Sequence, residues 1–185
     1  ERLNRMAVMP VDIKILQSIL DTREARAEKQ KEILKKYPHT LISFTLNTPG
    51  AKKSSDLYSK VHNVGMKAIL KSLRDNNKKI YFAQSYGYIT GPEGFISVDM
   101  DPIEAKKMVV ELENNHELGR IFDVDVFDKN HNQISRSMLN LAPRKCLICE
   151  KAARYCIRTR AHNYEELIKK VKEMSLNYFS NKEKP

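Results

Sequence analysis

The segment FDVDVF, residues 122–127, constrains the fold more than any other stretch of the chain. Apolar and acidic residues alternate there, and a period of two residues is that of a β-strand with two different faces. The apolar residues therefore point to a core, while Asp123 and Asp125 share the opposite face. Their backbones lie about 7 Å apart on such a strand, which lets both carboxylates converge on one cation.

Two neighbouring carboxylates repel each other unless a cation or an arginine neutralises them. Mg²⁺ does so through oxygen ligands and keeps positions open for phosphate oxygens, so Asp123 and Asp125 predict a metal site for phosphoryl or nucleotidyl transfer. The alternative is an edge strand whose aspartates face water. The segment 128–132 predicts a hairpin turn, and Gln133–Met138 a returning strand that places Arg136 near the acids.

Helical and strand-like periods alternate along the rest of the chain. Gly65 lies inside one helical segment, where it costs about 1 kcal/mol relative to alanine unless a neighbour packs closely. Together these patterns predict a single α+β domain over residues 1–185, with helices flanking a mixed sheet and with 1–10 and 180–185 as loose tails. The expected elements are helices at Val11–Lys36, after Ser55, from Asp101–Pro102 to Asn114–Asn115 and from Tyr164, and strands at Leu41–Leu46, Ile80–Gln84 and Phe95–Val98, with a turn at Thr90–Gly94.

The formal charge of +10 favours an anionic partner, which includes nucleic acid, a polyphosphate ligand and an acidic protein. Only charge supports a nucleic-acid-binding module, because the chain has no Trp and no recognisable nucleic-acid motif. Its sequence lacks an apolar run of about 18 residues and a signal-peptide pattern. We therefore expect a cytoplasmic protein with no membrane partner and no nucleic-acid partner.

The chain has only three cysteines, and an odd number leaves at least one unpaired, so the sequence does not predict a disulfide framework. Cys146, Cys149, Cys156 and His162 have the spacing C-x2-C-x6-C-x5-H, a ligand set that Zn²⁺ accepts in tetrahedral geometry. The same residues, 146–162, also fit a helix on which Cys149 and Cys156 share a buried face and need no metal. We expect reduced structural thiols, with structural Zn²⁺, and a zinc-stabilised interaction module without catalysis, as the alternative.

Four blocks of the sequence resemble the apo-citrate lyase phosphoribosyl-dephospho-CoA transferase family. They are LISFTLNTPGAKK, TGPEG, ELENNHELGRIFDVDVF and ISRSMLNLAPRKCLIC, and the resemblance extends from about Val11 to beyond His162. The related malonate decarboxylase holo-acyl-carrier-protein synthases share the paired aspartates but lack the block from Pro143 to His162. The resemblance therefore favours the citrate lyase family.

This resemblance implies a fold like that of the nucleotidyltransferases. It also implies that the phosphoribosyl-dephospho-CoA group moves from 2'-(5''-triphosphoribosyl)-3'-dephospho-CoA to a serine of the citrate lyase acyl carrier protein, with release of pyrophosphate. A malonate decarboxylase carrier is the alternative acceptor. In this reaction Mg²⁺ held by Asp123 and Asp125 would bridge the triphosphate, and one of the two aspartates would take the serine proton.

Further site residues follow from their place in the family blocks. Asn47, Gly50 and Lys53 belong to the strand-to-loop block, where a lysine after a glycine turn can meet a polyphosphate. Arg120 can fork onto a phosphate or form a surface salt bridge, and His116 can assist proton transfer or fix its loop. Arg23 and Arg26 recur in the family but also fit a solvated helix face, and basic residues around the cysteines can hold the CoA phosphates or an acidic carrier: Arg144, Lys145, Arg154, Arg158 and Arg160.

Overall fold

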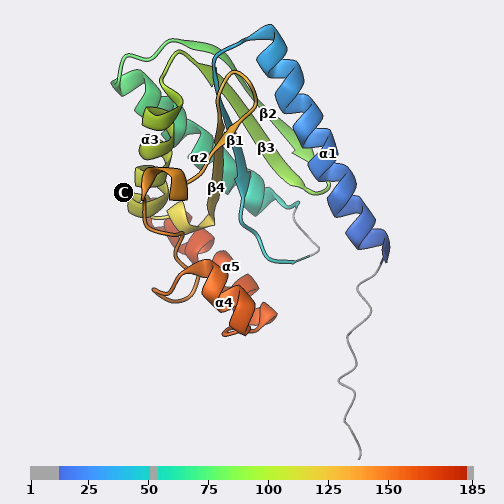
Figure 1. The fold of residues 1–185 in the computed structure, drawn as a ribbon. Helices are drawn as coiled ribbons and strands as arrows, with labels where there is room; N and C mark the ends of the chain where they lie inside the picture. Colours follow the sequence, from blue (N-terminus) through green and yellow to red (C-terminus); the bar gives the residue numbers. More distant parts are fainter. Residues whose placement is uncertain (1–12, 51–53, 183–185) are drawn as a thin grey trace, which may run out of the picture.

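A computed structural model describes residues 13–50 and 54–182 of the chain. Figure 1 shows how its elements are arranged. No helix in these two ranges is long and apolar enough to cross a membrane. In chain order the elements are α1 (Ile13–Lys36), β1 (Thr40–Leu46), α2 (Asp56–Asp75), β2 (Ile80–Tyr88), β3 (Gly91–Val98), α3 (Pro102–Asn115), the 3-10 helix η1 (Gly119–Ile121), β4 (Phe122–Phe127), β5 (Gln133–Ile134), the 3-10 helix η2 (Ser137–Leu139), α4 (Ala153–Thr159) and α5 (Tyr164–Lys182).

The five strands form one sheet in the order β2-β3-β1-β4-β5. The α+β class is confirmed, but the expectation of a mixed sheet was wrong, because every neighbouring pair is antiparallel. The connections through α2 and α3 do join strands that run in the same direction. An antiparallel strand lies between the two strands in each case, β3 between β1 and β2, and β1 between β3 and β4. Parallel strands therefore never become neighbours.

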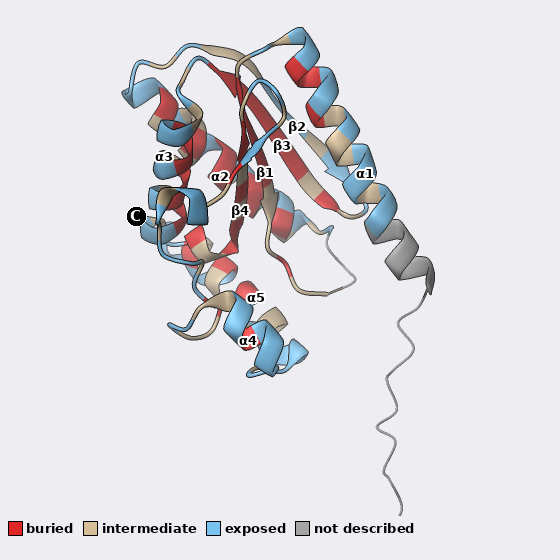
Figure 2. Cartoon of the chain, viewed as in Figure 1, coloured by how far each residue is buried: buried red, intermediate tan, exposed pale blue. Residues whose placement is uncertain are grey.

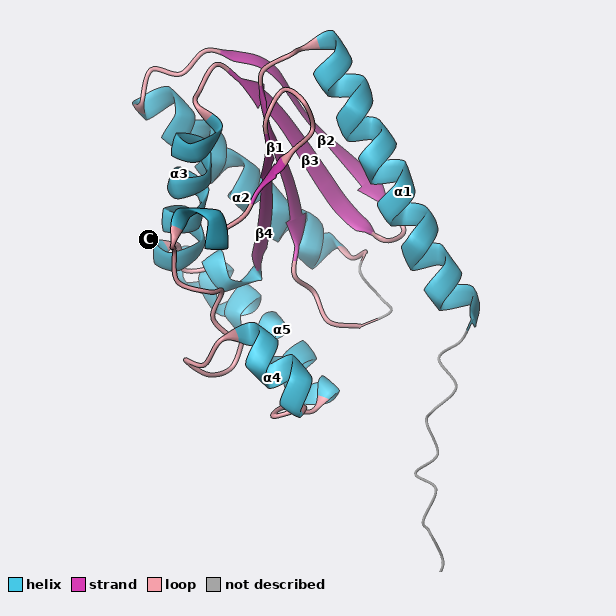
Figure 3. Ribbon diagram, in the orientation of Figure 1, coloured by secondary structure: helices cyan, strands magenta, loops and turns pink. Residues whose placement is uncertain are grey.

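Helices cover the two faces of the sheet unequally (Figures 1 and 3). The main core lies between one face and helices α2, α3 and α5, where the apolar residues of β1 and β4 are buried, among them Phe44 and Phe122. Of the described helices, only α1 crosses the opposite face, where it packs Ile33 and Leu34 on Leu41, Phe95 and Phe127. The buried positions follow the strands in Figure 2, whereas much of α1 and α4 is exposed. The face under α1 thus keeps room for polar side chains.

Local chemistry explains where the two central helices begin. The Ser55 hydroxyl accepts a hydrogen bond from the Tyr58 N–H (3.2 Å) and caps α2. Asp101 caps α3 in the same way, and Pro102 occupies the first turn. Gly65 has the close neighbour that its position requires, because a Cβ there would lie 2.3 Å from the Cζ atom of Phe44. These predicted helix starts are therefore confirmed.

Three predicted boundaries differ from the structure. Strands β2 and β3 are longer than expected and leave only Ile89 and Thr90 as the turn. Strand β3 can include Pro92 because its pairing with β1 ends at Gly94, so the missing N–H of Pro92 interrupts no hydrogen bond on that side. The predicted returning strand stops at Ile134, and η2 follows it. Helix α5 reaches Lys182, so residues 180–182 of the expected tail are helical.

Side chains explain why the returning strand is so short. A longer returning strand would have to form backbone hydrogen bonds with Val124 on the free edge of β4. The Val124 carbonyl instead accepts from the Lys106 ammonium (2.9 Å), and its N–H donates to Glu113 Oε1 (3.1 Å). Glu113 in turn forms a buried ion pair with Arg136. Helix α3 therefore closes this edge with side chains, which also protects it from pairing with other strands.

Candidate functional site

Strand β4 carries the acid pair as the alternation predicted. Phe122, Val124 and Val126 are buried in the main core, and Asp123 and Asp125 lie on the face that α1 crosses. The adjacent strand β1 places polar residues opposite the acids, with Thr45 across from Asp123 and Ser43 across from Asp125. The side chain of Asp123 is 47% exposed, so it is open to a ligand.

Each aspartate has its own set of polar contacts. Arg144 Nη1 donates to Asp123 Oδ1 (2.6 Å), and the Thr45 hydroxyl lies 3.4 Å from Oδ2 of the same carboxylate. Gln133 Nε2 donates to Asp125 Oδ1 (2.7 Å). Burial, and then the neighbouring charge of Asp123, raise the pKa of Asp125. Asp123 is thus partly neutralised by an arginine, whereas burial makes Asp125 harder to ionise.

A polar cavity of about 270 Å³ opens beside Asp123 on the α1 side of the sheet. Helix α1 contributes two arginines to it, and one of them, Arg26, pairs with the buried Glu93 of β3 (2.6 Å). Arginine and backbone groups around a carboxylate suit a polyphosphate with its cation. The lining residues are Thr22, Arg23, Arg26, Thr45, Leu46, Asn47, Thr48, Thr90, Gly91, Pro92, Glu93 and Asp123.

A second cavity of about 350 Å³ lies at the edge of β4, and Asp123 and Asp125 both line it. Arg136 also lines this cavity, which places it near the acids as predicted. Its guanidinium, however, pairs with Glu113 and donates to the Ala142 carbonyl (3.1 Å). Its side chain is only 14% exposed, so these contacts give Arg136 a structural role at the strand edge.

Arg120 and His116 lie close in sequence to the acids, but their side chains point elsewhere. Arg120 Nη1 donates to the Cys146 carbonyl (3.2 Å), and its other nitrogen forms an ion pair with Glu150. The His116 Nδ1 accepts from the Leu118 N–H (3.0 Å), and its ring packs 4.9 Å from that of Phe122, on the core side. Burial lowers the pKa of His116. Arg120 therefore forms a salt bridge and His116 fixes its loop, which are the structural alternatives given above for these two residues.

The loop after β1 brings one of the predicted residues, Asn47, to the cavities. The Asn47 N–H donates to the Ile121 carbonyl (2.7 Å), which ties the loop to the start of β4. Asn47 lines the polar cavity, and Gly50 has a φ of 106°, a conformation that favours glycine. Lys53 lies outside the described residues.

The cysteine segment does not form the predicted helix. Only Ala153–Thr159 is helical, while Cys146 and Cys149 lie in the preceding loop and His162 lies in the turn after α4. The local reason is a chain reversal, in which Lys145 pairs with Ala152 as an isolated β-bridge and the Cys146 N–H donates to the Lys151 carbonyl (2.8 Å). This reversal turns Cys146 and Cys149 back towards α4.

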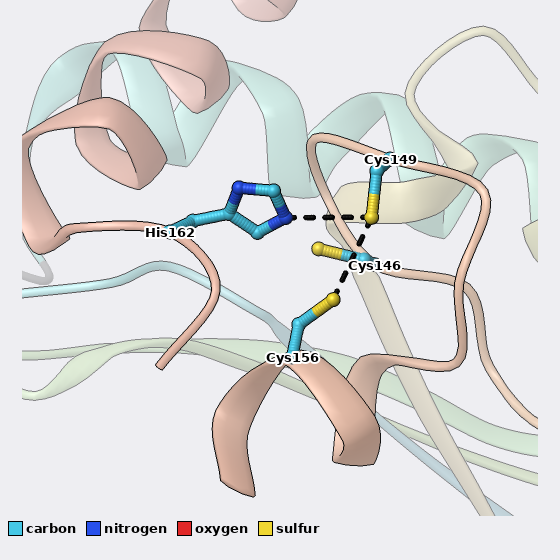
Figure 4. Close-up of side chains that lie close together, drawn as sticks. All are labelled: Cys146, Cys149, Cys156 and His162. Atoms are coloured by element: carbon cyan, nitrogen blue, oxygen red, sulfur yellow. Dashed lines mark hydrogen bonds between the residues drawn. The ribbon is translucent and has the colours of Figure 1, made fainter. Parts of the chain in front are cut away.

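The four residues of the predicted zinc pattern converge as a result (Figure 4). Their ligand atoms all lie within 4.8 Å of one another. Cys149 Sγ lies 3.5 Å from Cys156 Sγ and 3.3 Å from His162 Nε2. The predicted helical packing of the thiols was therefore wrong, and the structure contains a Cys3His cluster able to hold a metal ion.

An apolar cavity of about 640 Å³ adjoins the cysteine cluster. Asn47 lines this cavity as well as the polar one, so the two cavities meet at the loop after β1. Most walls of the apolar cavity come from α4, from α5 and from the loop that carries Cys146. The lining residues are Asn47, Pro49, Cys146, Leu147, Ala153, Cys156, Ile157, Arg160, His162, Asn163, Tyr164 and Leu167.

Sequence reasoning underrated several residues of the site. Arg144 was assigned only to a general basic region, yet it contacts Asp123. Arg23 and Arg26 were assigned to a solvated face, yet both line the polar cavity. Their spacing of three residues on a helix, and the polar alternation of Ser43 and Thr45 on β1, were the available signals. No local pattern pointed from Arg144 to Asp123, because 21 residues separate them.

Comparison with known proteins identifies the family. The profile of the family described as apo-citrate lyase phosphoribosyl-dephospho-CoA transferase matches residues 14–178. A probable apo-citrate lyase phosphoribosyl-dephospho-CoA transferase of Vibrio cholerae serotype O1 (strain M66-2) is 36% identical over 164 residues, which cover 88% of this chain and 92% of that protein. An apo-citrate lyase phosphoribosyl-dephospho-CoA transferase of Escherichia coli O7:K1 (strain IAI39) is 32% identical over 156 residues, covering 84% and 85%. The chain therefore belongs to the apo-citrate lyase phosphoribosyl-dephospho-CoA transferase family, and it is a transferase.

Proposed function

We propose that this chain transfers the phosphoribosyl-dephospho-CoA group from 2'-(5''-triphosphoribosyl)-3'-dephospho-CoA to a serine of the citrate lyase acyl carrier protein and releases pyrophosphate. Family membership supports the transfer to citrate lyase. The observation that carries the chemistry is the position of Asp123 and Asp125, which share one strand face, with Asp123 at the rim of the arginine-lined polar cavity. This arrangement suits a nucleotidyl transfer from a triphosphate.

The residues around the acid pair fit Mg²⁺. Two carboxylates on one face supply oxygen ligands, and burial together with the charge of Asp123 raises the pKa of Asp125, a shift that a bound cation would oppose. When bound, Mg²⁺ supplies the charge that neutralises the triphosphate and the leaving pyrophosphate. Arg144 meets part of this need on Asp123.

The protein's own groups account for the remaining steps. Arg23 and Arg26 line the polar cavity and place positive charge where the β- and γ-phosphates of the donor would lie. One of the two aspartates, Asp123 or Asp125, accepts the proton of the attacking serine, directly or through water. Pairing with Glu93 holds Arg26 in position, which reduces the reorganisation needed when the donor binds.

The two neighbouring cavities match the two chemical halves of the donor. The polar cavity suits the triphosphate, and the apolar cavity of about 640 Å³ suits the adenine and pantetheine parts of the dephospho-CoA half. Asn47 lies at their junction, where the ribosyl link would pass. A donor bound in this way presents its α-phosphorus next to Asp123.

The proposal is tested by the intact mass of a purified apo citrate lyase acyl carrier protein after incubation with the enzyme, Mg²⁺ and the triphosphoribosyl donor. We expect a mass increase equal to one phosphoribosyl-dephospho-CoA group, together with one pyrophosphate per modified carrier. An acceptor whose serine is replaced by alanine is the control. No mass increase would refute the proposed reaction, and an increase only on a malonate decarboxylase carrier would reassign the acceptor.

A further inference from the structure

We propose that Cys146, Cys149, Cys156 and His162 bind one Zn²⁺ ion, and that this structural ion holds Arg144 in place against Asp123. The zinc site is independent of the identity of the donor and of the carrier, whereas the link to Arg144 rests on the proposed function. The proposal begins with the geometry of the four side chains, which come from the loop before α4, from α4 itself and from the turn after it (Figure 4).

Two separations of the ligand atoms are close to those of a tetrahedral zinc site, and all the ligand atoms lie within 4.8 Å of one another. Zn–S bonds of about 2.3 Å and a Zn–N bond of about 2.0 Å place two sulfurs about 3.8 Å apart, and a sulfur and a nitrogen about 3.5 Å apart. The observed values are 3.5 Å between Cys149 and Cys156, and 3.3 Å between Cys149 and His162. A disulfide would need about 2.05 Å between the sulfurs, so Cys149 and Cys156 are not bonded to each other.

The surroundings of the cluster suit a thiolate site. The Ile148 N–H donates to Cys146 Sγ (3.5 Å), as backbone amides do towards negatively charged sulfur. Three thiolates and a neutral histidine leave a net charge of −1 on a bound Zn²⁺, and the segment that carries the ligands is rich in basic residues. These are Arg144, Lys145, Arg154, Arg158 and Arg160.

Few buried side chains anchor helix α4. Helix α4 has only seven residues, which is too short to be stable alone. Cys156 is its one buried residue, whereas Tyr155 and Ile157 are 41% and 77% exposed. Apolar burial therefore stabilises α4 weakly, and a metal that links the loop, the helix and the following turn would supply the missing constraint.

The cluster is connected to the acid pair through hydrogen bonds. The Ala153 N–H, at the start of α4, donates to the Arg144 carbonyl (2.8 Å). Arg120 Nη1 donates to the carbonyl of Cys146, a zinc ligand in the proposal (3.2 Å). Arg144 then donates through Nη2 to the Arg120 carbonyl (3.1 Å) and through Nη1 to Asp123. Fixing Cys146 and Cys156 therefore fixes the backbone that carries Arg144.

The first test measures zinc in protein purified without chelators or added metal. We expect about one zinc per chain by elemental analysis and an X-ray absorption spectrum with three sulfur and one nitrogen neighbours. Cys156→Ser and His162→Asn should lose most of the zinc and unfold at a lower temperature. Tyr155→Ser, an exposed neighbour on α4, is the matched control and should keep both.

Zinc well below one per chain, with three freely reactive thiols, would overturn the proposed site, as would a Cys149–Cys156 disulfide found by mass spectrometry. Because the wild-type spectrum and zinc content do not depend on any variant, misfolding of Cys156→Ser would leave the test intact.

The link to Arg144 is tested separately. A zinc-selective chelator, with Mg²⁺ in excess, should lower transfer at least tenfold in the wild type, and Arg144→Met should keep its zinc. Unchanged transfer after zinc removal would overturn the link.

Discussion

The sheet and the cysteine module, residues 144–162, are held together by different forces. In the sheet, fully buried apolar residues lie on adjacent strands, with Phe44 and Phe122 in the main core and Phe95 under α1. The cysteine module has one seven-residue helix, one isolated β-bridge and a cluster of four metal-binding side chains. Hydrophobic burial thus stabilises the first region, whereas the second buries few side chains and is joined mainly by polar contacts (Figure 2).

The candidate site lies where these two regions meet. Asp123 comes from a strand of the sheet, and Arg144, its ionic partner, comes from the cysteine module. The sheet therefore fixes the two acids, whereas the cysteine module carries Arg144, which neutralises one of them. Perturbing each region in turn should separate what the acids do from what their surroundings do.

The largest effect is expected for the acids on the sheet. Asp123→Asn or Asp125→Asn should lower kcat by about 10²-fold to 10³-fold, or about 3 to 4 kcal/mol, because each removes a charge required in the transition state. The variants should remain folded, since both side chains are only partly buried. Glu111→Gln, an exposed residue on α3, is the control. Wild-type kcat in both variants at saturating Mg²⁺ would rule out the metal-site assignment.

The core of the sheet should respond to acid through His62. This histidine on α2 is buried and stacks on Phe44, and among the described buried side chains its Nε2 has no hydrogen-bond partner. Burial lowers the pKa of His62 from 6.5 to about 4. Above pH 6.5 the His62 side chain is neutral in both the folded and the unfolded protein. Between pH 6.5 and 4 only the unfolded chain binds the proton, so the free energy of unfolding should fall by about 3 kcal/mol as the pH is lowered.

This pH dependence is measured by denaturant unfolding of the wild type and of His62→Phe across the same range. The difference between the two proteins should flatten above pH 6.5 and should grow towards pH 4. His39→Gln, which changes a histidine stacked on Tyr81, is the control. Parallel slopes for the wild type and His62→Phe would mean that His62 does not cause the acid sensitivity. Zinc release followed in the same titration shows whether the cysteine module opens before the sheet.

The junction of the two regions should be the next most sensitive point. Arg144→Met removes the guanidinium that contacts Asp123 and should lower kcat by about tenfold to a hundredfold, less than loss of the acid, because the carboxylate itself remains. Lys145→Met, which removes the adjacent charge paired with Glu150, is the control. Steady-state transfer assays measure both variants. Equal kcat for Arg144→Met and the wild type would mean that the ion pair has no part in the reaction.

The smallest effect is expected on the outer surface of the cysteine module. Arg154, Arg158 and Arg160 are exposed and present positive charge to solvent. Their triple replacement by serine should raise KM for the acidic carrier several-fold and flatten the salt dependence of kcat/KM, with little change in KM for the donor. An increase confined to the donor would instead place these arginines at the CoA phosphates. Replacing the exposed Lys67, Lys71 and Arg74 of α2 provides a charge-matched control.

The sequence predicted the elements of the sheet well, because their signals are local. The alternation in residues 122–127 requires one acidic and one apolar face whatever the strand pairs with, and the caps at Ser55 and Asp101 act within one turn of helix. The acid pair was predicted for the same reason. Two aspartates at positions i and i+2 of a strand share a face in any sheet.

Only the tertiary structure decided which partners those elements meet. The same residues, 146–162, fit a helix or a metal site, and the choice depended on a chain reversal between Lys145 and Ala152 that helical spacing does not reveal. Arg120 and Arg144 look alike in sequence, yet the first pairs with Glu150 and the second with Asp123, because ion pairs are set by the path of the chain. Periodicity thus determines which face a residue occupies, while long-range packing determines what lies across from it.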